Sequence, residues 1–353
     1  MTLRVPALGA PGTHAYHRFV RDVEPAPASP LPRLTRLLER VPATRRLLDA
    51  GPLTQRRLAL AGLAGNIGIV ITGGAVRLTG SGLGCPTWPK CTEDSYTTTA
   101  AMGINGAVEF GNRLLTFVLG AIAVLLVLAA WRHPRLRALS VILLLGIPGQ
   151  GVVGGITVLT DLNPYVVGLH FLLSTVMIAG SYALWQRTVP RPEAVPGAVR
   201  LRGLTWALTA ASAVVVVIGV IVTGSGPHAG DDKARRTGLN PEMISQLHVD
   251  AVFLMLGLAV ACWFAARAVP SPAMARASAI LLAVSLAQGA IGFVQYFTHL
   301  PAVLVGFHMA GACAVWVATL GVVWATGFDA PGAAGSAPSA TRPETDRTLV
   351  TVR

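Results

Sequence analysis

Eight long apolar segments constrain the fold of this chain more than any other feature. A helix that crosses a bilayer needs about 20 mostly apolar residues, and the segments are close to that length. Charged residues make up only 12% of the sequence, against about 25% in ordinary soluble domains. We therefore expect an all-α integral membrane protein with eight transmembrane helices, at residues 58–76, 108–131, 138–158, 165–186, 203–223, 246–266, 274–297 and 301–326.

The chain carries a net charge of +12, and the positions of its arginines explain this excess. Arginines gather before residue 58, after residue 326 and in every second link between the apolar segments, whereas the other links hold few basic residues. This is the positive-inside distribution, and it predicts that both termini are cytoplasmic. We expect no nucleic-acid partner, because the basic residues form no face with aromatic or base-reading neighbours.

The residues outside the apolar segments form two tails and one long link. Residues 1–57 are a basic, proline-rich cytoplasmic tail without the apolar core of a secretory leader. Within it, residues 34–48 form either a basic amphipathic segment on the inner membrane surface, interrupted at Pro42, or poorly ordered chain. We expect 187–202 to be a cytoplasmic linker and 327–353 to be a disordered cytoplasmic tail.

The apolar segments repeat as two units of four. Residues Gln150–Gly154 return as Gln288–Gly292, and a histidine follows each glutamine by 20 residues. Upstream, Ile69–Gly73 is echoed by Val220–Gly224. Each unit crosses the membrane an even number of times, so the two share one orientation and should be related by an axis along the membrane normal. The repeat predicts two pseudo-symmetric four-helix bundles, at 58–186 and 203–326.

Four polar side chains occupy matched positions in this repeat. His170 matches His308, and Asn112 matches His248. Under the predicted topology, all four lie about one helical turn inside the outer start of their helices. Strongly coordinating side chains within a membrane are costly and are usually functional. We therefore expect one pair of site residues in each half.

The second half is expected to bind heme. Facing histidines in a helical bundle are a common way to hold a heme iron axially, and His248 and His308 fit this arrangement. A proton relay would need a chain of carboxylates, and helices of this half offer only Asp250 near the same depth. A zinc site would need three or four protein ligands. The pair therefore favours an axially ligated heme iron.

The first half has a different pair. His170 remains, but Asn112 stands opposite, so a heme held by His170 alone would keep one face of its iron open. Glu109 lies one turn before Asn112, with Arg113 beside it, and could serve as an acid–base or charge-stabilising group. The alternative is a structural Glu109–Arg113 pair at the membrane interface. An open iron face suits an oxidising reaction, whereas electron transfer does not require one.

The first outer loop carries two cysteines, Cys85 and Cys91, in a segment rich in glycine and proline. On the oxidising side of the membrane a disulfide between them would persist and close a small ring. Metal binding by two cysteines alone is a weaker interpretation. In the second outer loop, His228 and Asp231 either contact heme propionates or shape the loop.

These motifs resemble the heme A synthase family. The resemblance covers about residues 58–326 and rests on a Gly-Ser-Gly-Leu-Gly-Cys-Pro-Thr-Trp-Pro loop, a Glu-x-x-Asn-Arg motif, and placed histidines. The residues that carry it are Gly73–Pro89, Cys91, Glu109–Arg113, His170, Thr223–Asp231, His248 and His308.

The resemblance implies an eight-helix enzyme of two halves. Such an enzyme oxidises a ring methyl of heme O to a formyl group, with water as the oxygen source and an electron acceptor yet to be named. The heme A formed is used by cytochrome c oxidase. His248 and His308 correspond to the ligands of a heme b cofactor, while the first half is expected to receive heme O through His170 and Asn112, with Glu109 and Arg113 catalytic.

The family pattern also implies a setting and partners. It places the chain in a bacterial plasma membrane, surrounded by lipid and as a monomer or oligomer. A heme O synthase and cytochrome oxidase assembly proteins are the expected neighbours, and the cysteine pair corresponds to one implicated in redox steps.

The sequence departs from the family pattern at Asn112, where the motif has histidine. This predicts either a one-histidine substrate site or a relative that binds heme without the chemistry. Because His170, Glu109, Arg113 and the cysteine loop are all present, we favour retained activity. A b-type electron carrier would more naturally keep two bis-histidine sites. A transporter would be expected to have interrupted helices with charges at the membrane midplane.

Overall fold

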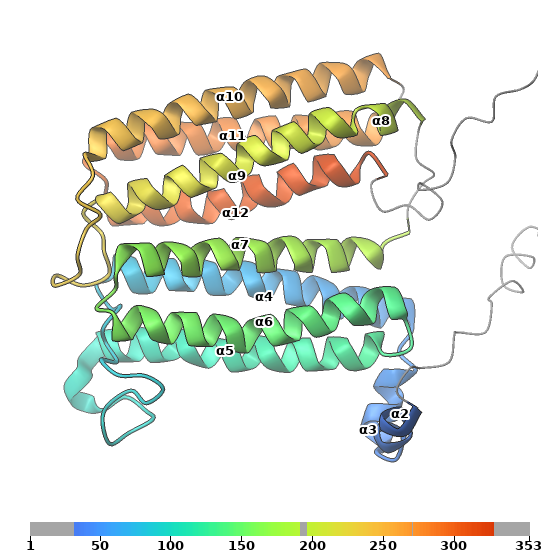
Figure 1. Ribbon diagram of the computed structural model, residues 1–353, viewed down its shortest axis with the longest axis horizontal. Coiled ribbons are helices and arrows are strands. Elements are labelled where there is room, and N and C mark those ends of the chain that lie inside the picture. The colour runs from blue at the N-terminus through green and yellow to red at the C-terminus, as the bar shows by residue number, and fades with distance from the viewer. Residues whose placement is uncertain (1–31, 191–195, 270, 328–353) are drawn as a thin grey trace, which may run out of the picture.

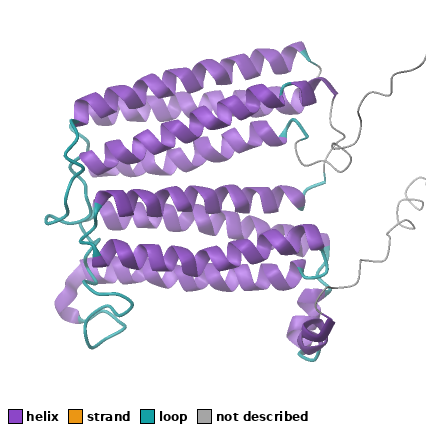
Figure 2. Ribbon diagram, in the orientation of Figure 1, coloured by secondary structure: helices purple, strands orange, loops and turns teal. Residues whose placement is uncertain are grey.

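The computed structural model describes residues 32–190, 196–269 and 271–327, and over these ranges every regular element is a helix (Figure 2). The tails at 1–31 and 328–353, and part of the predicted linker at 191–195, lie outside the described residues. The helices are α2 Pro32–Glu39, α3 Pro42–Leu48, α4 Pro52–Leu78, the 3-10 turn η1 Ala100–Met102, α5 Gly103–Ala130, α6 Pro134–Leu159, α7 Pro164–Arg187, α8 Pro196–Arg200, α9 Arg202–Ser225, α10 Pro241–Ala268, α11 Pro272–Phe297 and α12 Ala302–Trp324.

Eight of the described helices are long and apolar enough to cross a membrane: α4, α5 together with η1, α6, α7 and α9–α12. They confirm the predicted all-α class and the number of spans. Several start earlier than their apolar segments, because their ends are set by polar capping and by proline. Asn240, for example, accepts hydrogen bonds from the amides of Glu242 and Met243 (2.9 and 3.0 Å). Proline stands at the first turn of α4, α6, α7, α10 and α11, where its missing N–H is not needed.

The eight helices form two groups of four (Figure 1). In one, α4 packs on α5, α5 on α6, α6 on α7 and α7 back on α4; in the other, α9, α10, α11 and α12 close a ring in the same way. Each ring has its own apolar core. The order of contacts around each ring follows the order of the sequence repeat.

The two groups meet along α4 and α7 on one side and α9 and α12 on the other. A shared core cluster joins α4, α7 and α12, with Ile178 and Val70 packed against Cys313. The indole N–H of Trp316 donates to the carbonyl of Thr175 across this junction (3.0 Å). The contacts of α12 with α4, α7 with α9, and α12 with α7 are those that a twofold axis along the helices would produce. The pseudo-symmetry itself stays a prediction.

One end of the bundle, here called the loop end, carries the connections at 79–99, 160–163, 226–240 and 298–301 (Figure 1). Arg77, at the end of α4, joins the two halves there. Its Nε donates to the carbonyl of His228 (2.6 Å) and its Nη2 to that of Thr223 (2.9 Å). The amide of Gly82 also donates to the carbonyl of Gly230 (2.8 Å). These bonds fix the loops at 79–99 and 226–240 against each other.

Replacing Arg77 with alanine is expected to loosen this junction. Each hydrogen bond from a charged donor contributes about 1.5–3 kcal/mol, so the free energy of unfolding should fall by about 3 kcal/mol when both are lost. Thermal unfolding of the purified protein in detergent measures the change. Arg36→Ala is the matched control, because Arg36 only bonds its own helix at an exposed site. Equal midpoints for the two variants would contradict the assignment.

At the opposite end, two short helices rest against α5. The amphipathic segment predicted at 34–48 is helical and breaks at Pro42, where α3 starts. The indole N–H of Trp131 donates to the hydroxyl of Thr35 (3.0 Å), and Arg132 forms exposed ion pairs with Glu39 and Asp49 (2.8 and 3.3 Å). The segment is therefore folded onto the bundle; its place on the membrane surface stays a prediction.

Candidate heme sites

The four matched residues lie near the loop end but deeper than the sequence suggested. His170 is six residues after the start of α7 and His308 six after the start of α12, while His248 is seven into α10 and Asn112 nine into α5. At about 3.6 residues per turn, this depth is about two turns or more, so the expected single turn was wrong. The apolar segments marked the membrane-crossing part, whereas the helices themselves begin earlier, at their capping residues.

Each of the four side chains packs on a glycine of the preceding helix in the chain. A Cβ added to Gly154, Gly219 or Gly292 would lie 3.3, 3.1 or 3.2 Å from Cε1 of its histidine, and one added to Gly73 would lie 3.9 Å from Nδ2 of Asn112. The missing side chain lets the imidazole lie against the helix backbone. These contacts pair Gly73–Asn112, Gly154–His170, Gly219–His248 and Gly292–His308.

The echo between Ile69–Gly73 and Val220–Gly224 does not mark equivalent contacts. The glycine that faces His248 is Gly219, whereas Gly224 faces Thr237 and Pro164 at the loop end. By contact, the equivalent of Gly73 is therefore Gly219, which lies more than one helical turn before Gly224. The echoed sequence in the first helix of each half thus does not mark equivalent positions, although the histidine positions do match.

In the second half, His248 and His308 have ring centroids 6.4 Å apart, with ring planes at 72°. A metal–imidazole bond is about 2.0–2.1 Å and the bonded nitrogen lies about 1.1 Å from the ring centre, so two axial imidazoles on one metal place their centroids about 6.3 Å apart. The observed spacing matches this value. The pair predicted from the repeat is thus brought together at the distance that a shared iron requires.

The histidine nitrogens support the same fit. Nδ1 of His170, His248 and His308 is buried and has no hydrogen-bond partner among the described residues, although each side chain as a whole is only partly buried. One ring nitrogen of each histidine is therefore buried without a hydrogen-bond partner, which is a costly arrangement that suits a ligand-binding role better than a packing role. No group of three or more His, Cys, Asp or Glu residues suited to a metal ion occurs in the described chain. A heme suits these sites because it needs only one or two axial side chains.

Two glutamines, noted in the sequence only as markers of the repeat, hold the histidine helices. Nε2 of Gln288 donates to the carbonyl of His308 (2.5 Å). Nε2 of Gln150 donates to the hydroxyl of Ser174 (3.0 Å) and lies 3.5 Å from the carbonyl of His170. In both halves the glutamine therefore ties the third helix to the fourth beside its histidine. Its spacing of 20 residues from the histidine was the signal that could have revealed this role.

Replacing Gly292 with valine is expected to displace the His308 ring. The added Cβ would lie 3.2 Å from Cε1 of His308, and the branched methyl groups would come closer still, in a packed interior that tolerates little overpacking. The amount of heme retained by the purified full chain should fall, as measured by the reduced-minus-oxidised absorbance spectrum. Gly289→Val on the same helix is the control, because a Cβ there meets nothing within 4 Å. Equal heme content in both variants would contradict the packing argument.

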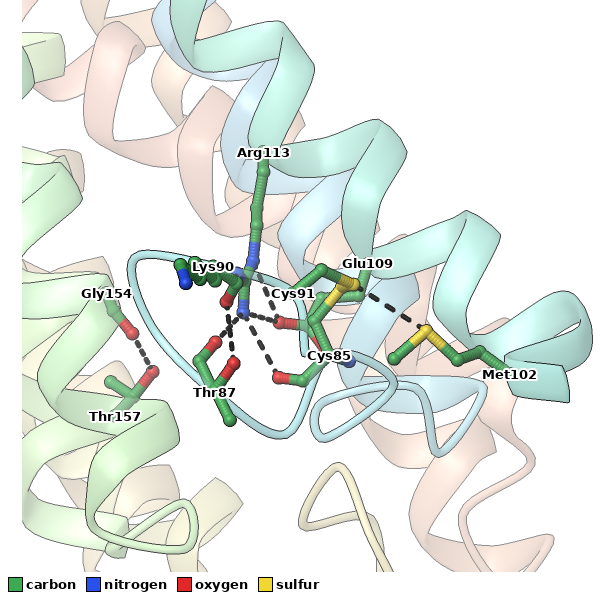
Figure 3. A network of polar contacts seen from close by, with 9 residues as sticks. All are labelled: Cys85, Thr87, Lys90, Cys91, Met102, Glu109, Arg113, Gly154 and Thr157. Carbon is green, nitrogen blue, oxygen red and sulfur yellow. Dashed lines mark hydrogen bonds and ion pairs between the residues drawn. A yellow bond between two sulfur atoms is a disulfide. The ribbon is translucent and has the colours of Figure 1, made fainter. Parts of the chain in front are cut away.

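The first half has an additional structure, a loop closed by the disulfide between Cys85 and Cys91, as predicted. Figure 3 shows Glu109 and Arg113 reaching from α5 into this loop. Oε2 of Glu109 accepts a hydrogen bond from the amide of Cys85 (2.6 Å), and Oε1 accepts two from Arg113 (2.6 and 3.1 Å). Glu109 is only 6% exposed. Both of its oxygens are therefore engaged by the loop and its neighbour.

Arg113 completes this clamp. Its guanidinium donates to the carbonyls of Cys85, Thr87 and Lys90 at 3.1–3.2 Å. A planar guanidinium with five N–H donors is suited to such a fan of acceptors. The structural Glu109–Arg113 pair that the sequence left as an alternative is thus present, and it extends to the loop backbone. The acid–base role of Glu109 stays a prediction.

The disulfide loop also rests on α6. Trp88 packs so closely on Gly155 that an added Cβ would overlap the indole, and Gly155 adjoins Gly154, which faces His170. The loop therefore packs on α6 at the loop end of the first half, one residue from the glycine that faces His170. In the second outer loop, a ring nitrogen of His228 hydrogen-bonds the carbonyl of Leu300 (2.8 Å) and Asp231 accepts from the amide of Lys233 (2.8 Å). Both residues shape that loop.

Comparison with known proteins identifies the family. Residues 56–320 match the family described as cytochrome oxidase assembly protein (COX15-CtaA). The chain belongs to this family. The matched range includes all eight spans apart from their outermost residues, together with both histidine pairs and the disulfide loop. The family and the eight apolar helices make the chain a multi-pass membrane protein.

Individual relatives are similar over shorter stretches. A heme A synthase of Halalkalibacterium halodurans is 33% identical over 132 residues, covering 35% of this chain and 44% of the relative. A heme A synthase of Methylobacterium radiotolerans is 30% identical over 202 residues, covering 46% and 54%. One from Listeria monocytogenes serotype 4a is 31% identical over 117 residues, covering 31% and 38%. The chain thus spans about half the length of the curated relatives it matches.

Proposed function

We propose that this protein is a heme A synthase, an oxidoreductase that converts a ring methyl of heme O to a formyl group and so supplies heme A for cytochrome c oxidase. The observation that carries the proposal is the inequality of the two sites. His248 and His308 stand at the spacing of two axial ligands, whereas the equivalent pair in the first half is His170 and Asn112. One site suits a resident heme, and the other suits a heme whose iron keeps a free face.

In the second half, His248 and His308 would hold heme b as a cofactor. When bound, this heme takes up and passes on electrons. Gly219 and Gly292 let the two imidazoles lie against the helix backbones, and Gln288 fixes the turn that carries His308. The chain therefore orients both ligands from rigid helices, which holds a site more accurately than loops do.

In the first half, heme O would be bound as substrate, with His170 as its axial ligand. The oxidation of a methyl to a formyl group takes its oxygen from water and releases protons and electrons, so it needs a proton acceptor and an electron acceptor. Glu109 is the carboxylate that would accept the proton. Arg113 forms an ion pair with it and would stabilise its charged form. The disulfide loop, held by Glu109 and braced on α6 by Trp88, would cover the outer end of the site and limit access of bulk water.

The proposal extends to the organisation of the chain. Residues 58–186 would form the substrate half and 203–326 the cofactor half. The loop end would face the outside of a bacterial plasma membrane, because the arginines beside the links at 131–133 and 188–190 lie at the other end of the bundle. A heme O synthase and cytochrome oxidase assembly proteins would then deliver the substrate and accept the product.

The proposal is tested by co-expressing the protein with a heme O synthase and separating the extracted hemes by chromatography. Heme A formed only when this chain is present supports it. A second candidate, a b-type electron carrier, is favoured only by the complete His248–His308 pair. It predicts bound heme b with heme O unchanged, and that result would contradict the synthase proposal.

A further inference from the structure

Beside the Gly73–Asn112 contact, Thr72 also contacts Asn112. The three glycine–histidine contacts have no such threonine. The residue before the facing glycine is Val153, Ile218 or Ile291 wherever a histidine lies opposite. Before Gly73 it is Thr72, and the opposing residue is Asn112. At the position just before the facing glycine, a hydroxyl therefore occurs only where the imidazole has been replaced by an amide.

The two side chains are hydrogen-bonded. Oγ1 of Thr72 donates to Oδ1 of Asn112 (2.7 Å), and the same oxygen lies 3.1 and 3.2 Å from the carbonyls of Gly68 and Ile69 on its own helix. A side-chain amide has one acceptor end and one donor end. Because the oxygen end is held by Thr72, the donor end, Nδ2, is left without a hydrogen bond to any described residue.

The sequence repeat gives this donor its expected place by equivalence. Asn112 and His170 lie on the second and fourth helices of the first ring. His248 and His308 lie on the second and fourth helices of the second ring. In the second half the two ring centroids are 6.4 Å apart, the separation expected of two ligands on one iron. The Asn112 amide therefore belongs on the iron face opposite His170. An amide nitrogen has no basic lone pair, so it offers that face an N–H donor but no ligand.

We infer that Asn112 is a hydrogen-bond donor to whatever small ligand occupies the free iron face of the substrate heme, and that Thr72 is the residue that positions it. This inference rests on the proposed function for the identity of that heme. Donors beside an open iron face govern which ligands bind and how tightly. The same chain would thus hold one heme closed to external ligands and one open to them, with an oriented donor at the open face.

Ligand binding tests this inference without requiring turnover. The purified full chain, loaded with heme O, is reduced and titrated with carbon monoxide, then oxidised and titrated with cyanide. We expect both ligands to bind the first-half heme and to spare the second-half heme. Asn112→His should close the open site and abolish carbon monoxide binding, with a second low-spin spectrum in its place.

Two further variants isolate the donor. Asn112→Leu keeps the site open but removes the N–H, so cyanide should bind about 3- to 10-fold more weakly, the range expected for one hydrogen bond. Thr72→Val should weaken cyanide binding in the same direction, and Thr72→Ser should restore it. Thr209→Val is the matched control, because that buried hydroxyl bonds only its own helix, at the carbonyl of Thr205. The second-half spectrum reports whether each variant is folded.

Each outcome is decisive. Native cyanide affinity in Asn112→Leu, or a native protein that binds no carbon monoxide, would overturn the inference. Weakening by Thr209→Val equal to that by Thr72→Val would remove Thr72 from its positioning role. Failure of the proposed function is separable, because a protein that makes no heme A can still show the ligand-binding pattern, and one that makes heme A can fail to show it.

Discussion

Replacing His308 with alanine is expected to remove the heme of the second half. The imidazole is one of two that stand 6.4 Å apart, and its loss would leave the proposed heme iron with one protein ligand. Even outer-shell partners of a metal ligand cost about 10- to 100-fold in affinity when removed, so losing the ligand itself should cost more. Heme content of the purified protein, measured as the pyridine adduct per polypeptide, should fall to the amount held by the first half, and synthesis of heme A should cease.

Three companion variants sharpen this experiment. His248→Ala should behave like His308→Ala, since the proposal gives both imidazoles to one iron. His170→Ala should leave the b-type spectrum intact while reducing retention of added heme O. His133→Ala is the control, because His133 lies at the opposite end of the bundle, before α6. An unchanged b-type spectrum in both His248→Ala and His308→Ala would refute the second-half assignment.

The second large effect is expected at Glu109. Alanine there removes the acceptor of the Cys85 amide and the partner of Arg113, and with them the proposed proton acceptor. General acid–base groups contribute about 10²- to 10⁴-fold to rate, so heme A formation should fall by at least that range. The b-type spectrum should be spared, because Glu109 belongs to the other half.

The glutamine variant separates holding the loop from acting on the proton. Glu109→Gln keeps one carbonyl oxygen as the acceptor for Arg113, turns an NH2 group toward the Cys85 amide, and cannot take up a proton at neutral pH. Exposure of the Cys85–Cys91 disulfide is followed by its rate of reduction and alkylation. A native reduction rate with no product would assign the loss to the carboxylate itself. Native product formation would show that Glu109 only holds the loop, and the acid–base role would be wrong.

The sequence predicted the fold well because each membrane helix is encoded by one continuous stretch of the chain. About 20 consecutive apolar residues identify a span without any knowledge of its neighbours. The ends were less accurate, as at α10, which begins at Pro241 rather than near 246. Hydropathy reports where hydrocarbon begins, whereas Asn240 and Pro241 decide where the helix begins. This difference also explains why the histidines lie deeper in their helices than expected.

The candidate site was predictable only in part. The internal repeat exposed the histidines and Asn112, and the cysteine spacing exposed the disulfide. The residues that hold them were missed, because their roles depend on contacts between helices that no local pattern records. In the sequence, nothing distinguishes Gly292 from the other glycines of the apolar helices. Its role becomes visible only from its contact with His308 in the structure. Thr72 likewise gains its meaning only from the bond to Asn112.

The structure also changes how the Glu109–Arg113 pair is understood. As a sequence motif, it suggested a catalytic carboxylate with a neighbouring charge. In the fold, the same pair binds the backbone of the disulfide loop at several points. A site-covering loop and a candidate proton acceptor are therefore coupled through one carboxylate. Any change of charge at Glu109 would therefore alter the hydrogen bonds that hold the disulfide loop.

The most direct test of the central proposal uses purified protein, heme O, an artificial electron acceptor and water labelled with oxygen-18. The hemes are then extracted and analysed by mass spectrometry. The account predicts heme A whose formyl oxygen carries the label when extraction is fast relative to exchange, and no product with Glu109→Ala. Unchanged heme O in the presence of intact heme b and a competent acceptor would contradict it.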